Sequence, residues 1–396
     1  MEIQNLFLII ISVWGIGVIF RKLNLPVLLG ELLAGLILGP ALLGVFQNTV
    51  SIQILSELGI FFLMLHAGLE SNPHELLNAS KKSILIALGG VILPLVLGIV
   101  VAKSFGFNFL ESLFIGMSLS VTAIAVTTKV FKEFKFNKSE IAHLTMSAAI
   151  IDDILAFLML SIILGVVQKN SLFNWVDFLI IVGKVSLFFG GVIIIGQKLL
   201  PIFKKIFQEQ GHKAFTFLLV IALAFGLLAE KIGLHSILGA YLAGLFVKEE
   251  ITHPEVYRKL EDRLFALSYS FLGPIFFISL GFHVDFKIFQ DSSMLIFLIL
   301  IILAAITGKI IGAGGIAYGL RKNIHEALII GISMNGRGAV ELIIAVIGLE
   351  QGLINSQVFS VLILMAFITT LMTPISLKYA LKGLKNYSNS SLPIPS

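Results

Sequence analysis

The chain has 396 residues, of which 57% are hydrophobic and only 13% are charged. A soluble domain carries about 25% charged residues, so this composition excludes an ordinary soluble enzyme or binding domain. The formal net charge is +5, but the basic residues lie in short stretches between apolar runs and form no single stripe, which argues against nucleic acid as a partner.

Apolar runs separated by charged residues or by Gly, Pro and Asn predict thirteen transmembrane helices. About 20 apolar residues, rising 1.5 Å each, cross the ~30 Å hydrocarbon core of a bilayer. The predicted fold class is therefore an all-α polytopic membrane protein. The predicted helices are 3–20, 25–45, 51–69, 83–102, 110–128, 139–167, 174–198, 213–229, 234–247, 263–282, 293–319, 324–348 and 355–377.

The distribution of basic residues tests this number of helices. If the odd-numbered loops and the C-terminus face the cytoplasm, that side holds 21 of the 28 lysines and arginines, and the other side holds four. The remaining three, Lys184, Lys309 and Arg337, lie inside predicted helices. Cytoplasmic loops of membrane proteins carry such an excess. The pattern predicts an N-terminus outside and a C-terminus inside.

Short stretches of the first half of the sequence recur in the second half. The similar pairs are 25–36 with 234–245, 61–65 with 276–280, and 116–120 with 331–335. Each pairing shifts by seven predicted helices, an odd number, so the two copies have opposite orientations in the membrane. The sequence therefore predicts an inverted repeat of six plus six helices, with 174–198 as the connector.

Two adjacent aspartates, Asp152 and Asp153, lie near the middle of the predicted helix 139–167. A carboxylate at that depth costs about 2.5–3.5 kcal/mol on insertion scales, so it must face protein or water, and an ion or proton site is the default interpretation. Neighbouring side chains on a helix differ by about 100°, so the two have separate partners. One can coordinate a cation while the other pairs with a base.

Two predicted helices carry polar interruptions at corresponding places in the two halves. The first contains Ser120 and Thr122, and the second contains Asn335, Arg337 and Glu341. Corresponding interruptions of this kind point to broken helices at a transport site. The alternative is that Ser and Thr bond back within continuous helices. Arg337 and Glu341 have i,i+4 spacing and can pair, and this pair could serve only to neutralise charge.

Lys309 lies near the centre of the predicted helix 293–319, too deep to reach an interface easily. We expect an internal partner, one of the two aspartates. Burial favours the neutral form of a lysine, so a role as proton carrier is also expected.

The aspartate pair, Ser120-Val121-Thr122-Ala123, Lys309 and Asn335-Gly336-Arg337-Gly338 together resemble the monovalent cation:proton antiporter superfamily. The resemblance is to the branch with paired aspartates, which includes electrogenic bacterial Na⁺/H⁺ antiporters, spore-germination antiporters and the membrane part of Kef-like, glutathione-gated potassium efflux proteins. It covers about residues 5–380.

The resemblance implies a homodimer in which a core transport domain, with two crossed broken helices, moves like an elevator against a dimerisation domain. The implied boundaries are 1–82 and 213–292 for dimerisation, 83–168 and 293–385 for transport, 169–212 for the connector and 386–396 for a polar tail.

The resemblance also assigns roles to individual residues. Asp153 matches the ion-binding carboxylate. Asp152 matches a position that is Asp in electrogenic members, and Lys309 matches its partner. Thr122 matches the residue at the first break, so Na⁺ is expected at Asp153, Asp152 and Thr122, with Ser120 supplying a further oxygen. Asn335, Arg337 and Glu341 are expected to support this site.

The predicted function is a secondary transporter in a prokaryotic inner membrane that exchanges a monovalent cation for protons electrogenically, without a cofactor. Na⁺ is the first choice, with Li⁺ or K⁺ also possible. The alternatives are K⁺/H⁺ exchange as part of a potassium efflux system, and an organic anion symporter of similar fold. The chain is not expected to be an enzyme, because an aspartyl protease needs two converging carboxylates and adjacent ones on a helix diverge.

Overall fold

The computed structural model describes residues 2–23, 25–70, 80–168, 175–198, 212–246, 254–320 and 322–390, and every regular element in these residues is a helix. The chain forms two compact units, and each is assembled from separate stretches of sequence. The first comprises Met1–Leu23, Val27–His74 and Phe157–His283, and the second comprises Asn24–Pro26, Glu75–Ala156 and Val284–Ser396.

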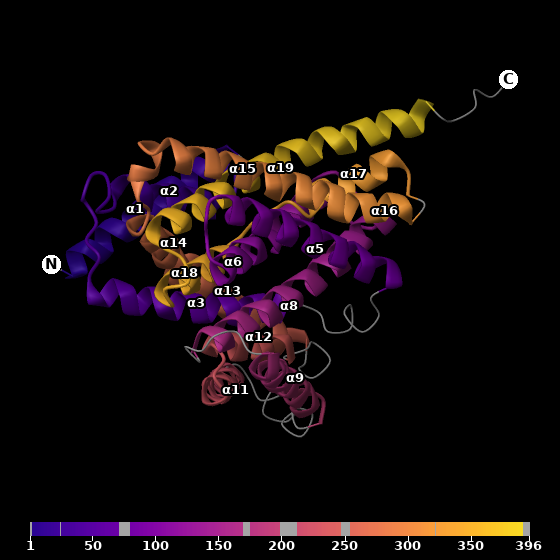
Figure 1. The fold of residues 1–396 in the computed structure, drawn as a ribbon. Helices are drawn as coiled ribbons and strands as arrows, with labels where there is room; N and C mark the ends of the chain where they lie inside the picture. Colours follow the sequence, from indigo (N-terminus) through magenta and orange to yellow (C-terminus); the bar gives the residue numbers. More distant parts are fainter. Residues whose placement is uncertain are drawn as a thin grey trace. The chain divides into compact units, whose positions relative to one another are not determined.

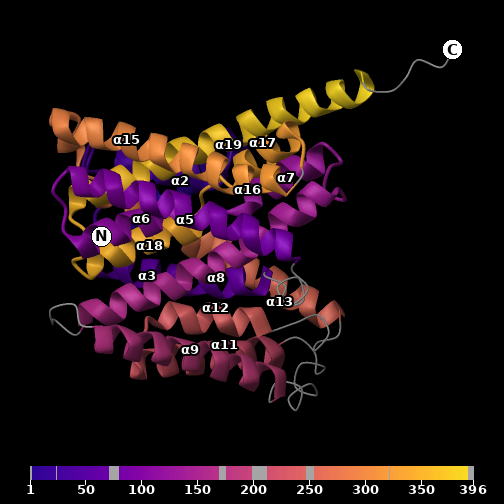
Figure 2. The ribbon, with the colours of Figure 1, turned by 45° about the vertical axis from the view of Figure 1, so that its right-hand side comes forward.

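The first unit contains long apolar helices that approach one another closely at glycines. A Cβ on Gly35 or Gly68 would collide with the main chain of Ile278 or Tyr241, so these positions require glycine. Helices α9, α11 and α12 lie side by side (Figure 2). The elements are α1 Glu2–Lys22, α2 Val27–Leu38, α3 Val50–Glu70, α9 Trp175–Lys198, α11 His212–Lys231, α12 Ser236–Phe246, α13 Pro254–Leu267, the π-helical turn η2 Ser268–Leu272, and α14 Gly273–Phe282 (Figure 1).

The second unit contains all the predicted site residues. Helix α8 begins in it, and from Phe157 onward the same helix belongs to the first unit. Helix α5 packs against α6 and α15, and α19 packs against α15 and α17. The elements are α5 Lys81–Ser104, α6 Phe109–Ser120, α7 Ile124–Glu133, α8 Glu140–Gln168, the 3-10 helix η3 Phe286–Phe289, α15 Ser292–Lys309, the π-helical turn η4 Ile310–Gly314, α16 Gly315–Gly319, α17 Ile324–Ser333, α18 Ala339–Glu350 and α19 Ser356–Ser390 (Figure 1).

Local sequence explains where α6 starts. The Asn108 side chain accepts a hydrogen bond from the Glu111 N–H, and the Glu111 carboxylate accepts one from the Asn108 N–H. This reciprocal capping satisfies two donors that a helix start leaves open. Elsewhere in the unit, apolar residues including Ile86, Phe131 and Ile330 form a buried cluster that joins α5, α7 and α17. The start of α6 is therefore capped by its own sequence, and α7 is held by apolar packing.

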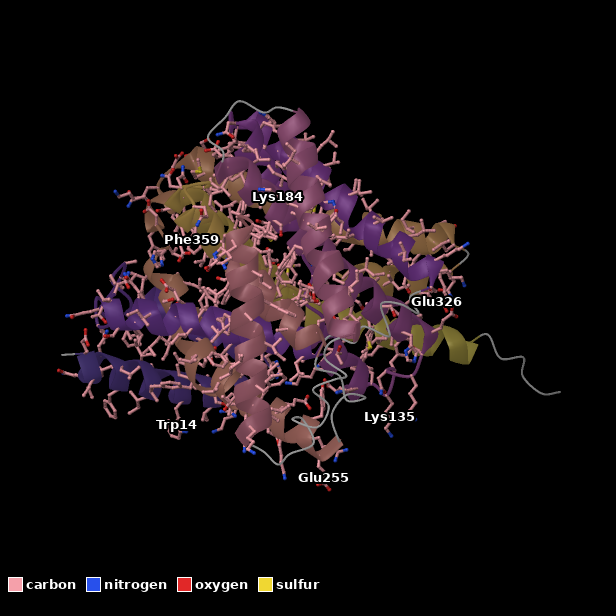
Figure 3. All side chains as sticks on the ribbon, turned by 90° about the horizontal axis from the view of Figure 1, so that it is seen from below. Trp14, Lys135, Lys184, Glu255, Glu326 and Phe359 are labelled. Atoms are coloured by element: carbon pink, nitrogen blue, oxygen red, sulfur yellow. The ribbon has the colours of Figure 1, made fainter. Side chains whose placement is uncertain are left out.

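Each of the thirteen predicted ranges contains a helix. Eight helical segments of the described residues are long and apolar enough to cross a membrane, and further apolar helices of 10–17 residues accompany them. Large apolar side chains such as Trp14, which Figure 3 labels on α1, are widely exposed, at 69% in that case. Apolar side chains on the outside are expected where the surroundings are lipid. The number of crossings stays a prediction.

Several predicted helix ends were wrong. The helix predicted at 25–45 ends at Leu38, because Pro40 lacks an N–H and disfavours helical backbone at the residue before it. The helix predicted at 263–282 is preceded by α13, which starts at Pro254 and was missed because it is rich in charged residues. The final helix, predicted at 355–377, continues to Ser390, so the start of the predicted polar tail 386–396 is helical.

Candidate functional site

The first element of the site is the gap between α6 and α7. Helix α6 ends at Ser120 and α7 starts at Ile124. Between them, Val121 and Ala123 have extended backbones, with φ and ψ of −67° and 145° and of −110° and 119°. Extended backbone removes the intrahelical partners of the last α6 carbonyls and the first α7 N–H groups. The gap therefore exposes hydrogen-bonding groups that need partners from elsewhere.

The second element is the gap between α17 and α18. Helix α17 ends at Ser333 and α18 starts at Ala339. The two gaps touch, because the Ala123 N–H donates a 2.7 Å hydrogen bond to the Gly336 carbonyl. A Cβ on Gly336 would lie 2.9 Å from the Ala123 carbonyl oxygen, so this close approach requires glycine. The sequence placed the two interruptions far apart, and the fold brings them into contact.

Two cationic side chains satisfy the open carbonyls at the end of α6. Arg337 donates to the carbonyls of Ser118, Leu119 and Val121. Lys309 donates to the carbonyl of Ser120. The carbonyl end of a helix carries about half a negative charge, so cations stabilise it. Both side chains are fully buried.

Neutral hydroxyls, in contrast, satisfy the carbonyls at the end of α17. Thr127 donates to the Ser333 carbonyl at 2.8 Å, and Thr122 donates to the Met334 carbonyl at 3.0 Å. In the gap that follows, Thr370 donates to the Arg337 carbonyl at 3.0 Å. Thr127 and Thr370 were not predicted as site residues, although a hydroxyl near a broken helix is a usable signal in a sequence.

Lys309 joins the first gap to the aspartate pair. Its ammonium nitrogen lies 2.8 Å from Asp152 Oδ2 and 2.7 Å from Thr122 Oγ1. With the Ser120 carbonyl, these acceptors use all three N–H donors of a lysine. Lys309 and Asp152 have no exposed side-chain surface. Ser120 contributes its carbonyl to Lys309, while its hydroxyl donates to the Met117 carbonyl at 2.6 Å.

Close packing against α5 holds Lys309 in place. A Cβ on Gly308 would meet Pro94, and a Cβ on Gly312 would collide with the Gly89 carbonyl. The chain also leaves α-helical geometry directly after Lys309, in the π-helical turn η4. Such turns inside helices are frequent at functional sites.

Several buried oxygens at the site have no hydrogen-bond partner among the described residues. They are Asp152 Oδ1, Asp153 Oδ1, Ser333 Oγ, Asn335 Oδ1 and both carboxylate oxygens of Glu341. Asp153 is half-buried, whereas the others are buried. No group of three or more His, Asp or Glu in the described parts of the chain is arranged as a metal centre. Oxygen ligands of this kind suit hard cations such as the alkali ions, and the soft ligands that select zinc or copper do not occur among them.

The charges of the site do not balance. Asp152, Asp153 and Glu341 carry three negative charges when ionised, and Lys309 and Arg337 carry two positive charges. These groups act on one another electrostatically. The four helix ends that meet here, two carbonyl ends and two N–H ends, cancel in sign. The fully ionised site therefore carries a net charge of −1, which one additional positive charge would neutralise.

Comparison with known proteins places the chain in a family. Residues 7–383 match the family model described as "Sodium/hydrogen exchanger, transmembrane". The chain is 32% identical over 393 residues to a Na⁺/H⁺ antiporter of Enterococcus hirae, covering 98% of this chain and all of that protein. It is 30% identical over 387 residues to the Na⁺/H⁺-K⁺ antiporter GerN of Bacillus cereus, covering 96% and 97%.

The fold is also similar to a solved structure. The sodium proton antiporter MjNhaP1 from Methanocaldococcus jannaschii at pH 8 superposes with a TM-score of 0.76 at 20% identity, covering 96% of this chain and 98% of that one. Its fold matches the helical, membrane-type fold described above. The chain belongs to the sodium/hydrogen exchanger family, whose members are membrane transporters that exchange cations for protons and are not enzymes.

Proposed function

We propose that the chain exchanges Na⁺, and less favourably Li⁺ or K⁺, for protons at Asp153, and that the exchange is electrogenic. The single missing positive charge of the ionised site supports cation binding, and the aspartate at position 152, which the resemblance assigns to electrogenic members, supports the electrogenic part. One alkali cation restores the neutrality of the ionised site, and protons on the same carboxylates remove the negative charge that attracts the cation. Cation and proton therefore exclude each other at the same carboxylates, which couples their movements without two sites filled at once.

The buried contacts support a role for each predicted residue. Asp153 Oδ1 and Asp152 Oδ1 have no partner and supply hard oxygen ligands, as alkali cations prefer. Thr122 Oγ1 and the Ser120 carbonyl are linked to Asp152 through Lys309, which donates to all three. When a cation binds Asp152, it weakens the Asp152–Lys309 pair, and Lys309 keeps the Thr122 and Ser120 oxygens as partners. Asn335, Arg337 and Glu341 support this arrangement.

The division into two units supports the proposed domain roles. The second unit, which holds every site residue, overlaps the predicted transport domain 83–168 and 293–385. The first overlaps the predicted dimerisation domain 1–82 and 213–292 and the connector 169–212. We assign elevator movement to the second unit and dimer contacts to the first. The thirteen crossings, the inverted repeat, the outward N-terminus, the inward C-terminus and the prokaryotic inner membrane belong to the same proposal.

Potassium is the second candidate for the cation. The name of GerN includes K⁺ beside Na⁺, and the oxygens without partners at the site suit either ion. An organic anion as the transported solute is disfavoured, because the ionised site lacks positive charge.

The test is proton flux in proteoliposomes under a fixed pH gradient, with Na⁺, Li⁺, K⁺ and choline added in turn. Asp153→Asn should lose all cation-dependent flux. Glu111→Gln, which changes a half-buried carboxylate of the α6 cap to another capping side chain, should keep it. Cation-dependent flux that persists in Asp153→Asn would refute the assignment. Flux that does not respond to membrane potential would refute the electrogenic part alone.

A further inference from the structure

Glu341 is a buried carboxylate to which the proposed exchange gives only a supporting role. It lies in the first turn of α18 and is 1% exposed. Neither of its carboxylate oxygens has a hydrogen-bond partner among the described residues. Buried carboxylates are normally hydrogen-bonded, so an exception requires an explanation. The inference below rests on the proposed function and names a further residue for it.

Arg337 is the nearest cation, but it cannot fully compensate Glu341. Its two terminal nitrogens donate to main-chain carbonyls at the end of α6. Only Nε faces Glu341, at 3.5 Å from Oε2, and this pair does not form a hydrogen bond. Glu341 therefore gains electrostatic attraction from Arg337 without the hydrogen bonds that normally hold a buried carboxylate in its charged form.

The electrogenic exchange needs a second proton. Lys309 stabilises the charged form of Asp152 through their 2.8 Å ion pair, which leaves Lys309 and Glu341 as the groups that can carry this proton. Lys309 donates to three oxygens, from Ser120, Thr122 and Asp152. A neutral amine has only two N–H groups, so its deprotonation would leave one of these buried oxygens without a donor. Protonation of Glu341, by contrast, breaks no hydrogen bond. On the contacts alone, Glu341 changes its charge more easily than Lys309.

We propose that Glu341 is the second proton-binding carboxyl group of the site and that Lys309 stays protonated throughout the cycle. Without a cation, Asp153 and Glu341 each hold a proton. When Na⁺ binds, both protons leave to water on the same side of the membrane, and Asp153 and Glu341 become charged. Two protons then exchange for one Na⁺, and one net charge crosses per cycle. Electrostatic interaction between Glu341 and Lys309 links the protonation of Glu341 to the state of the Asp152–Lys309 pair.

The experiment measures the number of protons per cation in two ways. In proteoliposomes, the Na⁺ gradient that nulls proton flux at an imposed membrane potential gives the coupling ratio, which does not depend on the rate. In purified protein, a pH dye in weak buffer counts the protons released when Na⁺ binds. The variants are Glu341→Gln, Glu341→Asp and Lys309→Arg. Glu341→Asp keeps a carboxyl group, and Lys309→Arg introduces a guanidinium, which does not lose its proton in a protein.

We expect two protons per Na⁺ in the unchanged protein, in Glu341→Asp and in Lys309→Arg, and one in Glu341→Gln. Exchange by Glu341→Gln should then no longer respond to membrane potential. A ratio of two in Glu341→Gln together with one in Lys309→Arg would assign the second proton to Lys309 and overturn the inference. If Lys309→Arg does not transport, proton release by Glu341→Gln decides alone. An unchanged protein without any Na⁺/H⁺ exchange would refute the proposed function itself.

Discussion

The Lys309 ammonium and the Asp152 carboxylate lie 2.8 Å apart, and neither side chain has any exposed surface. The two residues are 157 positions apart in the sequence. The pair connects the middle of α8 to the end of α15, next to the gap between α6 and α7. It is therefore both a structural contact of the second unit and part of the proposed ion path.

Asp152→Asn should destabilise the protein strongly. Removing one partner leaves a buried, unpaired lysine, and breaking a buried pair in this way costs about 3–5 kcal/mol. The double variant Asp152→Asn with Lys309→Gln should recover much of the loss, because it removes both charges. Thermal unfolding in detergent measures the difference.

A surface pair provides the matched control for that measurement. Glu133 and Lys378 lie 3.0 Å apart with 53% and 33% of their side chains exposed. Removing such a pair changes stability by about 0–1 kcal/mol, so Glu133→Gln should unfold near the temperature of the unchanged protein. Equal losses in Asp152→Asn and Glu133→Gln would contradict the central place given to the buried pair.

Thr122→Val should lower both stability and exchange. The valine keeps the shape but leaves the Met334 carbonyl without its donor and one Lys309 N–H without its acceptor. A buried group left unpaired costs about 1–3 kcal/mol. Thr122→Ser keeps the hydroxyl and serves as the control. The two measurements are the unfolding temperature and the Na⁺-dependent proton flux. A Thr122→Ser variant as impaired as Thr122→Val would show that the hydrogen bonds of the hydroxyl are not the cause.

Much of the site could be predicted from the sequence because burying a charge is costly. Asp152, Asp153 and Lys309 lie in apolar runs, where a charge without a partner is so costly that a functional role is the default interpretation. The two gaps in helices followed from polar and glycine-rich segments at corresponding positions. Such features are local, so they can be identified directly in the sequence.

The partners of Arg337 could not be predicted in the same way. Its i,i+4 spacing to Glu341 suggested a simple pair, yet its terminal nitrogens bind carbonyls more than 200 residues away. Main-chain carbonyls carry no sequence signal, and they become available only because α6 stops at Ser120. The start of α13 and the end of α19 were missed for a related reason, since these segments are helical but not apolar.

Gly312→Ala should reduce stability and exchange together. The new Cβ would meet the Gly89 carbonyl and force η4 away from α5, which moves the adjacent Lys309. Overpacking of this kind costs about 1–3 kcal/mol. Gly315→Ala, three residues later with open space at its Cβ, is the matched control and should behave like the unchanged protein. Normal flux in Gly312→Ala would show that the position of Lys309 tolerates this displacement.

Na⁺ binding should weaken as the pH falls. Protons and Na⁺ compete for the same carboxylates, so acid fills them with protons and alkali frees them for the cation. Where the protonated form dominates, each competing proton weakens apparent Na⁺ affinity by about tenfold per pH unit. With Asp153 and Glu341 both involved, the loss should be about a hundredfold per unit, and in Glu341→Gln it should be about tenfold.

Isothermal titration calorimetry of the purified protein at a series of pH values measures these slopes. Glu111→Gln, with its change outside the site, should keep the slope of the unchanged protein. A Na⁺ affinity that stays constant or increases on acidification would refute competition as the coupling mechanism, because competition at a shared carboxylate requires the affinity to fall. A slope in Glu341→Gln equal to that of the unchanged protein would leave the competition at Asp153 intact and remove Glu341 from it.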